Sequence, residues 1–289
     1  MTDTPGPGLV RRIVAFPLTL LVIEFAAIVL VGSGYSQAVH LVLTKNDGAA
    51  YSASALGLAV VLILTWKALQ RWLERRTDQE FALAGAGREL GLGLLAGFVL
   101  FSAATGIVAL LGGFEVLGLR GQGQLWAMVA MAVTSGTIEE ILFRGILLRH
   151  LEALIGTWGA LALTSLLFGA AHLANPGATL FAAFAIAMEA GILLGAAYLL
   201  TRRLWLAVGI HAAWNFTQGW VYSIPVSGHA TPLGLLITRR VGPEWLTGGD
   251  FGLEASVVAL VVATGAGVAM LVVAAMRGAI VPPMWLRQP

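Results

Sequence analysis

Long apolar stretches separated by short polar segments dominate this chain. Eight of them approach or reach the roughly 20 residues that a helix needs to cross a membrane. They run over residues 13–32, 50–68, 91–113, 125–148, 158–174, 178–200, 204–222 and 255–276. The first is longer than the apolar region of a signal peptide, about 7–15 residues, so we expect it to be retained. The pattern predicts an all-α, polytopic integral membrane protein with about eight transmembrane helices.

The composition agrees with this fold class. Hydrophobic residues make up 58% of the chain and charged residues only 11%, whereas soluble domains carry about 25% charged residues. There is no cysteine, which excludes disulfides, thiolate metal sites and thiol catalysis. The net charge of +2 gives no indication of a nucleic-acid partner.

The distribution of basic residues predicts the orientation. With the N-terminus in the cytosol, only four of the 17 basic residues fall in outer segments, and these are Lys45, Arg120, Arg239 and Arg240. Such an excess of positive charge marks the cytosolic side. We therefore expect a multi-pass protein of the cytoplasmic membrane, in contact with its lipids, with both termini in the cytosol.

We expect a single membrane-embedded domain over residues 1–289. Residues 1–10, rich in proline and glycine, are predicted to form a flexible tail. Residues 223–254 form the longest outer loop, where three prolines and six glycines predict a segment without a continuous helix. Glycines four residues apart predict close helix packing in lipid, and these pairs are Gly87 and Gly91, Gly93 and Gly97, and Gly191 and Gly195.

The fourth apolar stretch contains three charged residues, Glu139, Glu140 and Arg144. A charge near the bilayer centre costs roughly 2.5–3.5 kcal/mol on insertion scales. Because residues four apart share a helix face, Glu140 is predicted to pair with Arg144. Glu139 lacks such a partner, so it needs a proton, a metal ion or a residue from another helix. A buried ion pair that only orients helices is the structural alternative.

Two further apolar stretches carry polar side chains. His172 ends the fifth, and His211 and Asn215 lie four apart in the seventh, on one helix face. A carboxylate, two histidines and an amide can together activate water and stabilise an oxyanion. A rise of 1.5 Å per residue places Glu139 about 13 Å, His211 about 10 Å and His172 about 20 Å from the inner ends of their spans. The depth of His172 therefore disagrees with the other two.

These motifs, Glu-Glu-x-x-x-Arg, Phe-x-x-x-His and His-x-x-x-Asn on separate apolar helices, resemble the CPBP family. That family comprises type II CAAX prenyl endopeptidases, bacteriocin-processing enzymes and abortive-infection-type membrane proteins. The resemblance covers residues 125–218, about a third of the chain. It implies eight helices around a polar cavity open to the cytosolic side, in which a peptide bond of a membrane-associated protein or peptide is hydrolysed.

The resemblance also implies a role for each of the six residues. Glu139 would activate water that His172 positions, His211 and Asn215 would stabilise the oxyanion, and Glu140 and Arg144 would support the site. The family is called metalloprotease, although a metal-free glutamate mechanism is also argued for it. A Zn²⁺ ion, if present, would be held by Glu139, His172 and His211.

Two other functions use the same residues. A non-catalytic binding or immunity protein would use the cavity for recognition only. A proton-coupled transporter would use the buried carboxylates and histidines as a relay, but no two-half repeat is visible. Two more glutamates lie in apolar stretches. Glu24 is expected to serve packing, whereas Glu189 could either line the same cavity or pair with a polar neighbour.

Overall fold

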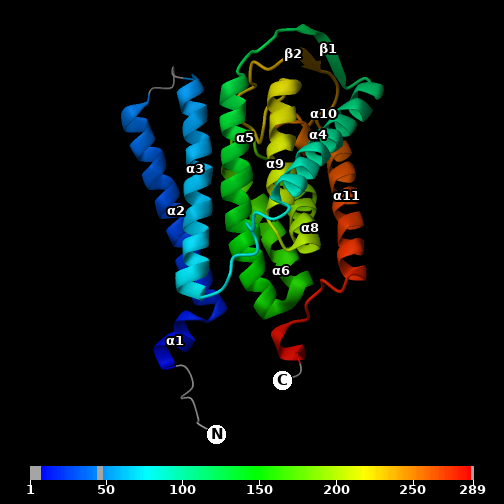
Figure 1. Ribbon diagram of the computed structural model, residues 1–289. Helices are drawn as coiled ribbons and strands as arrows, with labels where there is room; N and C mark the ends of the chain where they lie inside the picture. The colour runs from blue at the N-terminus through cyan, green and yellow to red at the C-terminus, as the bar shows by residue number, and fades with distance from the viewer. Residues whose placement is uncertain (1–7, 44–47, 288–289) are drawn as a thin grey trace.

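The computed structural model describes residues 8–43 and 48–287 and is nearly all-α (Figure 1). The elements, with η marking π- or 3-10-helical segments, are α1 (Leu9–Val14), α2 (Pro17–Val42), α3 (Gly48–Ala68), η1 (Leu69–Glu74), α4 (Ala86–Leu110), β1 (Phe114–Leu119), α5 (Leu125–Glu140), η2 (Ile141–Leu148), α6 (Arg149–Ala171), η3 (His172–Ala174), α7 (Leu180–Ile186), η4 (Ala187–Gly191), α8 (Ile192–Thr201), α9 (Trp205–Phe216), η5 (Thr217–Val221), β2 (Leu236–Arg240), α10 (Glu244–Thr247), η6 (Leu253–Ala255), α11 (Val257–Met276) and η7 (Met284–Leu286). Most of the predicted flexible tail, residues 1–7, lies outside the described residues, but Leu9 and Val10 already belong to α1.

Six helical segments in the described part of the chain are long and apolar enough to cross a membrane. They are Pro17–Val42, Ser52–Glu74, Ala86–Leu110, Leu125–Ala174, Leu180–Thr201 and Val257–Met276. A polytopic membrane protein is thus confirmed, whereas the number of eight spans is not. The segment Leu125–Ala174 contains the predicted fourth and fifth spans together. The predicted seventh span corresponds to α9 and η5, which are together shorter than any of the six.

The chain reverses at Gly156, and this turn corrects the predicted depth of His172. Helix runs without a break from α5 through η2 to the residue before Gly156, whose φ of 74° and ψ of 170° are not helical. The ring contact between Phe143 and Phe168, with centroids 4.8 Å apart, shows that the two arms lie side by side. Glu139 lies 17 residues before the turn and His172 lies 16 residues after it. The two side chains are therefore level, at about 25 Å of helix from the turn.

Close packing of α4 on α9 relies on glycine. A Cβ atom added to Gly93 would lie 2.4 Å from the Leu206 carbonyl oxygen, and one added to Gly97 would lie 2.3 Å from that of Ile210. The packing prediction is confirmed for these two. It holds also for Gly191 and Gly195, whose added Cβ atoms would lie 2.6 Å from Ser165 and 2.4 Å from Leu161. For Gly87 and Gly91 it is wrong, because no atom lies within 4 Å of either added Cβ.

A small antiparallel sheet, which the sequence does not predict, covers one end of the bundle. Strand β1, between α4 and α5, pairs with β2 in the predicted outer loop. We call residues 222–256, which join η5 to α11, the connecting segment. It has no long helix, as predicted, and contains β2, α10 and η6. The sheet lies at the end of the bundle opposite α1 and the last turn of α11 (Figure 1).

The substitution Gly97→Ala should destabilise the protein, whereas Gly91→Ala should not. The first adds a methyl group against a backbone oxygen and forces α4 away from α9, at a cost of about 1–3 kcal/mol. The second adds a methyl group in open space and favours the helix by up to about 1 kcal/mol. Thermal unfolding in one detergent measures both. Equal unfolding temperatures for the two variants would contradict the proposed α4–α9 contact.

Candidate active site

Glu140 is the buried centre of the site. Its carboxylate is fully buried, and its Oε1 atom accepts a hydrogen bond from Nη1 of Arg144 at 2.9 Å. This is the pair that the spacing of four predicts. The same oxygen lies 2.8 Å from Nδ1 of His211. This contact between His211 and Glu140, which the sequence analysis did not predict, joins α5 to α9.

Arg144 extends this connection to a third part of the bundle. Its Nη2 atom donates to the carbonyl oxygen of Ala190 at 2.8 Å, in η4. Its guanidinium carbon lies 4.6 Å from the ring centroid of Phe168, in α6. A charged arginine at 3% side-chain exposure needs such partners because an unpaired buried charge is very costly. Arg144 therefore fixes η2 against α6 and η4.

Glu139 takes no part in these buried hydrogen bonds. Its side chain is 29% exposed, and its Oε2 atom lies 3.9 Å from Nε2 of His211. This oxygen is buried and has no hydrogen-bond partner among the described residues. The carboxylate lines a cavity of about 290 Å³ together with His172 and Asn215. Glu139, on α5, thus lines one cavity together with side chains of η3 and α9.

The histidines both present their Nε2 atoms for use. Nδ1 of His172 lies 2.7 Å from the carbonyl oxygen of Phe168. A carbonyl can only accept, so Nδ1 carries the proton and Nε2 of the neutral ring keeps its lone pair. Nδ1 of His211 faces the Glu140 carboxylate in the same way. Holding one ring nitrogen to orient the other is typical of histidines that bind water or a metal ion.

Asn215 is held by a residue that the sequence analysis missed. Its Nδ2 atom donates to Oγ of Ser135 at 3.0 Å. Ser135 precedes Glu139 by four residues and lies on the same face of α5, which is the signal that could have found it. The amide of Asn215 retains a second N–H for another acceptor.

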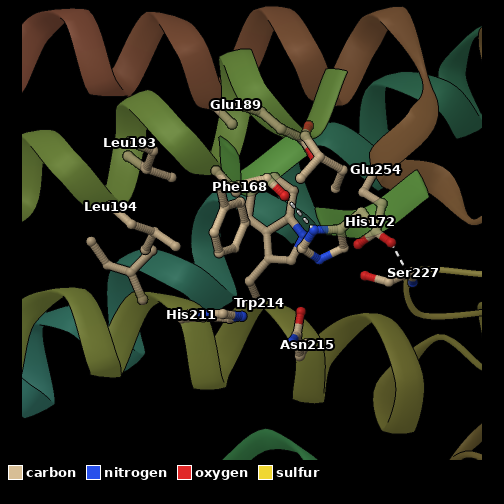
Figure 2. Close-up of a pocket in the computed structure, with 14 residues that line it drawn as sticks. Phe168, His172, Glu189, Leu193, Leu194, His211, Trp214, Asn215, Ser227 and Glu254 are labelled. Carbon is tan, nitrogen blue, oxygen red and sulfur yellow. Dashed lines mark hydrogen bonds between the residues drawn. The ribbon is translucent and has the colours of Figure 1, made fainter. Parts of the chain in front are cut away.

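Two neighbouring spaces meet at this site. The inner chamber, of about 30 Å³, includes His172, His211, Asn215, Ser227 and Glu254 in its wall (Figure 2). Since a cavity needs about 10–15 Å³ to admit one buried water molecule, this chamber has room for about two. The larger cavity that contains Glu139 shares His172, Asn215 and Ser227 with it. A water chamber thus borders a space large enough for part of a peptide.

Three side chains in these walls were not assigned to the site by the sequence analysis, which missed Ser227 and Glu254 and left the role of Glu189 undecided. Glu189 lines the inner chamber, and its Oε2 atom is buried without a hydrogen-bond partner among the described residues. Ser227 and Glu254 come from the connecting segment, where no motif marked them. Burial raises the pKa of Glu254 to about 7, against the opposing effect of hydrogen bonds from Ser227 and Gln218.

The position of the larger cavity conflicts with the expectation that the cavity opens to the cytosolic side while both termini are cytosolic. Its wall includes Val226, Ser227 and His229 of the connecting segment, which lies at the end of the bundle away from α1 (Figure 1). With both termini in the cytosol, these residues face the other side of the membrane. A cavity open to the cytosol and cytosolic termini are therefore not both compatible with this structure.

The predicted metal ligands do not form a compact set. In the described part of the chain, one group of three has its ligand atoms within 4.8 Å of one another, and it consists of Glu24, Glu74 and His150. The guanidinium of Arg149 already bonds to Glu24 and Glu74 there, which serves packing as expected for Glu24. The donor types of Glu139, His172 and His211 suit Zn²⁺, and among the described residues their ligand atoms do not all lie within 4.8 Å of one another.

Comparison with known proteins gives one match. Residues 121–217, about a third of the chain, match the family described as Rce1-like, type II CAAX prenyl endopeptidase Rce1-like. No curated protein and no solved structure matches the chain. The matched stretch contains all three motifs, from Glu139 to Asn215, and so confirms the resemblance on which the sequence analysis rests. Over this third of its length, the chain is therefore similar to the Rce1-like family of type II CAAX prenyl endopeptidases.

Proposed function

We propose that this protein is an intramembrane endopeptidase that hydrolyses a peptide bond of a membrane-associated protein or peptide. The observation that carries the proposal is the unpartnered carboxylate oxygen of Glu139, 3.9 Å from Nε2 of His211, in a cavity that also contains His172. Buried charge is expensive in a membrane protein and marks functional sites. A carboxylate without a partner is also the group that a hydrolase needs to accept a proton from water.

Glu139 and His172 activate the water in this proposal. A water molecule in the cavity donates one hydrogen bond to the Glu139 carboxylate and another to Nε2 of His172. As the water oxygen attacks the carbonyl carbon of the substrate, Glu139 takes its proton. When the C–N bond breaks, Glu139 returns that proton to the leaving amine. One carboxyl group thus serves as base and then as acid, and the atoms and charges balance.

His211 and Asn215 stabilise the oxyanion of the tetrahedral intermediate. Asn215 donates the N–H that Ser135 does not use. His211 donates from Nε2 when both ring nitrogens carry protons, with Nδ1–H held by Glu140. Donors fixed before the reaction are worth about 2.7–4 kcal/mol each in such sites. Glu140 and Arg144 touch no substrate in this scheme and act by holding His211 and η4 in place.

The proposal requires no metal ion in any step. The proposed substrate is a lipid-anchored peptide or protein, since the reaction takes place between membrane helices. Prenylated proteins that end in a CAAX sequence are the first class to test, because the matched family is named for them. The proposed location is the cytoplasmic membrane, with both termini in the cytosol.

Glu139→Gln should abolish cleavage without unfolding the protein, whereas Glu140→Gln should destabilise it. Loss of the base should lower kcat by about 10²–10⁴-fold. Loss of Glu140 leaves Arg144 buried without its counter-ion, which costs about 3–5 kcal/mol. Cleavage of internally quenched peptides carrying an S-prenyl cysteine, in liposomes, and thermal unfolding measure the two effects.

The contrast between the two glutamates decides the role assignment. Full cleavage by a folded Glu139→Gln variant would overturn it. If wild-type protein cleaves no lipid-anchored peptide and cells keep its biological effect with Glu139→Gln and His211→Ala variants, the cavity serves binding only.

Removal of metal ions should leave cleavage unchanged. In the proposed scheme Glu139 alone accepts and returns the proton, so a chelator should change kcat/KM by less than about twofold, against the large losses expected when a catalytic zinc is removed. Elemental analysis of the purified protein is the second measurement. Loss of cleavage with a chelator, restored by Zn²⁺ alone, would contradict the metal-free scheme.

Single cysteines in this cysteine-free chain should resolve the orientation. His229, in the connecting segment, and Arg287, directly after η7, are both exposed. With cytosolic termini, a membrane-impermeant maleimide added to spheroplasts should label His229→Cys, and should label Arg287→Cys only after permeabilisation. The reverse pattern would place the cavity on the cytosolic side and the termini outside.

A further inference from the structure

The connecting segment folds back into the bundle and contributes to the site. Leu253 is fully buried in the core formed with Phe101 and Trp214. Phe251 packs with Phe168 in a second cluster. Glu254, next to Leu253, is only 2% exposed. This outer segment therefore carries a carboxyl group to the wall of the inner chamber.

Glu254 holds the backbone of Ser227. Its Oε1 atom accepts a hydrogen bond from the Ser227 N–H (Figure 2). The side chains of Ser227 and Gln218 also lower the pKa of this carboxyl group, and Nε2 of Gln218 donates to the carbonyl oxygen of Pro225. A carboxylate only accepts hydrogen bonds. Beside an ionised carboxylate a hydroxyl can act only as a donor toward it, so the lone pairs of the Ser227 hydroxyl stay available to another donor.

The other side of Ser227 is bound to the turn that follows His172. Asn175 Nδ2 donates to the carbonyl oxygen of Ser227 at 3.0 Å, and the Asn175 N–H donates to that of His172 at 3.1 Å. The next residue, Gly228, approaches this turn so closely that an added Cβ would lie 1.9 Å from the Pro176 carbonyl oxygen. The Ser227 backbone is thus bound on both sides.

Ser227 adopts a backbone conformation that needs this support. Its φ is 49°, in the left-handed region that residues with a side chain seldom occupy. Such conformations persist where the surroundings enforce them, and they often occur at functional sites. Here the enforced conformation places the serine side chain in the wall shared by the inner chamber and the larger cavity, beside His172 and Asn215.

We propose that the Ser227 hydroxyl accepts a hydrogen bond from a backbone N–H of the substrate peptide, and that Glu254 is the positioning residue that holds Ser227 in place. This inference rests on the proposed endopeptidase function and extends it to the recognition of the peptide backbone. Ser227 lies where a peptide that reaches Glu139 from the larger cavity passes the histidines. The contact exists before the reaction begins, so it strengthens substrate binding and lowers KM.

Four variants separate the hydroxyl from the backbone conformation. Ser227→Ala should lower kcat/KM about tenfold through KM, the effect of one hydrogen bond. Ser227→Gly should show the same loss with equal or higher thermal stability, because glycine adopts a positive φ freely. Glu254→Gln keeps an acceptor for the Ser227 N–H and should stay within about threefold of wild type, whereas Glu254→Leu should match Ser227→Ala. Glu244→Gln, at an exposed glutamate of the same segment, is the matched control and should change nothing.

Binding to the inactive Glu139→Gln protein tests the contact itself. A cleavable lipid-anchored peptide is compared with analogues in which one amide is replaced by an ester, which removes a single N–H. At one position near the scissile bond, the ester should weaken binding to Glu139→Gln about tenfold and leave binding to the Ser227→Ala, Glu139→Gln double variant unchanged.

The outcomes separate this inference from the proposed function. If wild type cleaves the peptide and Glu139→Gln does not, the function stands. The inference is then overturned if every ester has the same effect with and without the Ser227 hydroxyl, or if Ser227→Gly retains full kcat/KM. If Glu254→Leu does not fold, Glu254→Gln and Ser227→Gly still give the decision. Absence of cleavage and binding by wild type would instead reject both proposals.

Discussion

The rest of the site depends on one buried carboxylate. Glu140 has no access to solvent, so its charge must be met inside the protein. The structure meets it with Arg144 on the same helix and His211 on α9. These bonds fix how α5 faces α9, and Arg144 extends the constraint to Phe168 and η4. The neighbouring Glu139 points to a face of the helix about 100° away, and it remains without a close ion pair because Arg144 and Nδ1 of His211 bind Glu140.

The turn at Gly156 is the second feature that determines the geometry of the site. Equal lengths of helix on its two sides bring His172 level with Glu139, while the Glu140 bond brings His211 to the same level from α9. The three side chains then meet at connected spaces, of which one is sized for water and the other for a substrate. Each histidine has its Nδ1 atom bound to a neighbour. The geometry that hydrolysis needs thus follows from two backbone features and a few buried hydrogen bonds.

Local spacing predicted the features that lie within one helix, and tertiary contacts decided the others. The apolar stretches, the Glu140–Arg144 pair and the close approach at Gly97 all follow from helix periodicity. The depth of His172 does not follow from helix periodicity, because the sequence gives no sign that the helix continues past Leu148 to a turn at Gly156. The bond between His211 and Glu140 could not be predicted either, since it joins two separate helices. Glu254 and Ser227 lie in a segment without periodicity, and only folding brings them to the site.

An experimental structure that shows ordered water tests the central claim most directly, namely that Glu140 is structural and leaves Glu139 free to activate water. The account predicts a water molecule bonded to the Glu139 carboxylate and to Nε2 of His172, with Glu140 still bridging Arg144 and Nδ1 of His211. It would be contradicted by a structure in which Glu139 pairs with Arg144, or in which Glu140 instead of Glu139 contacts the water.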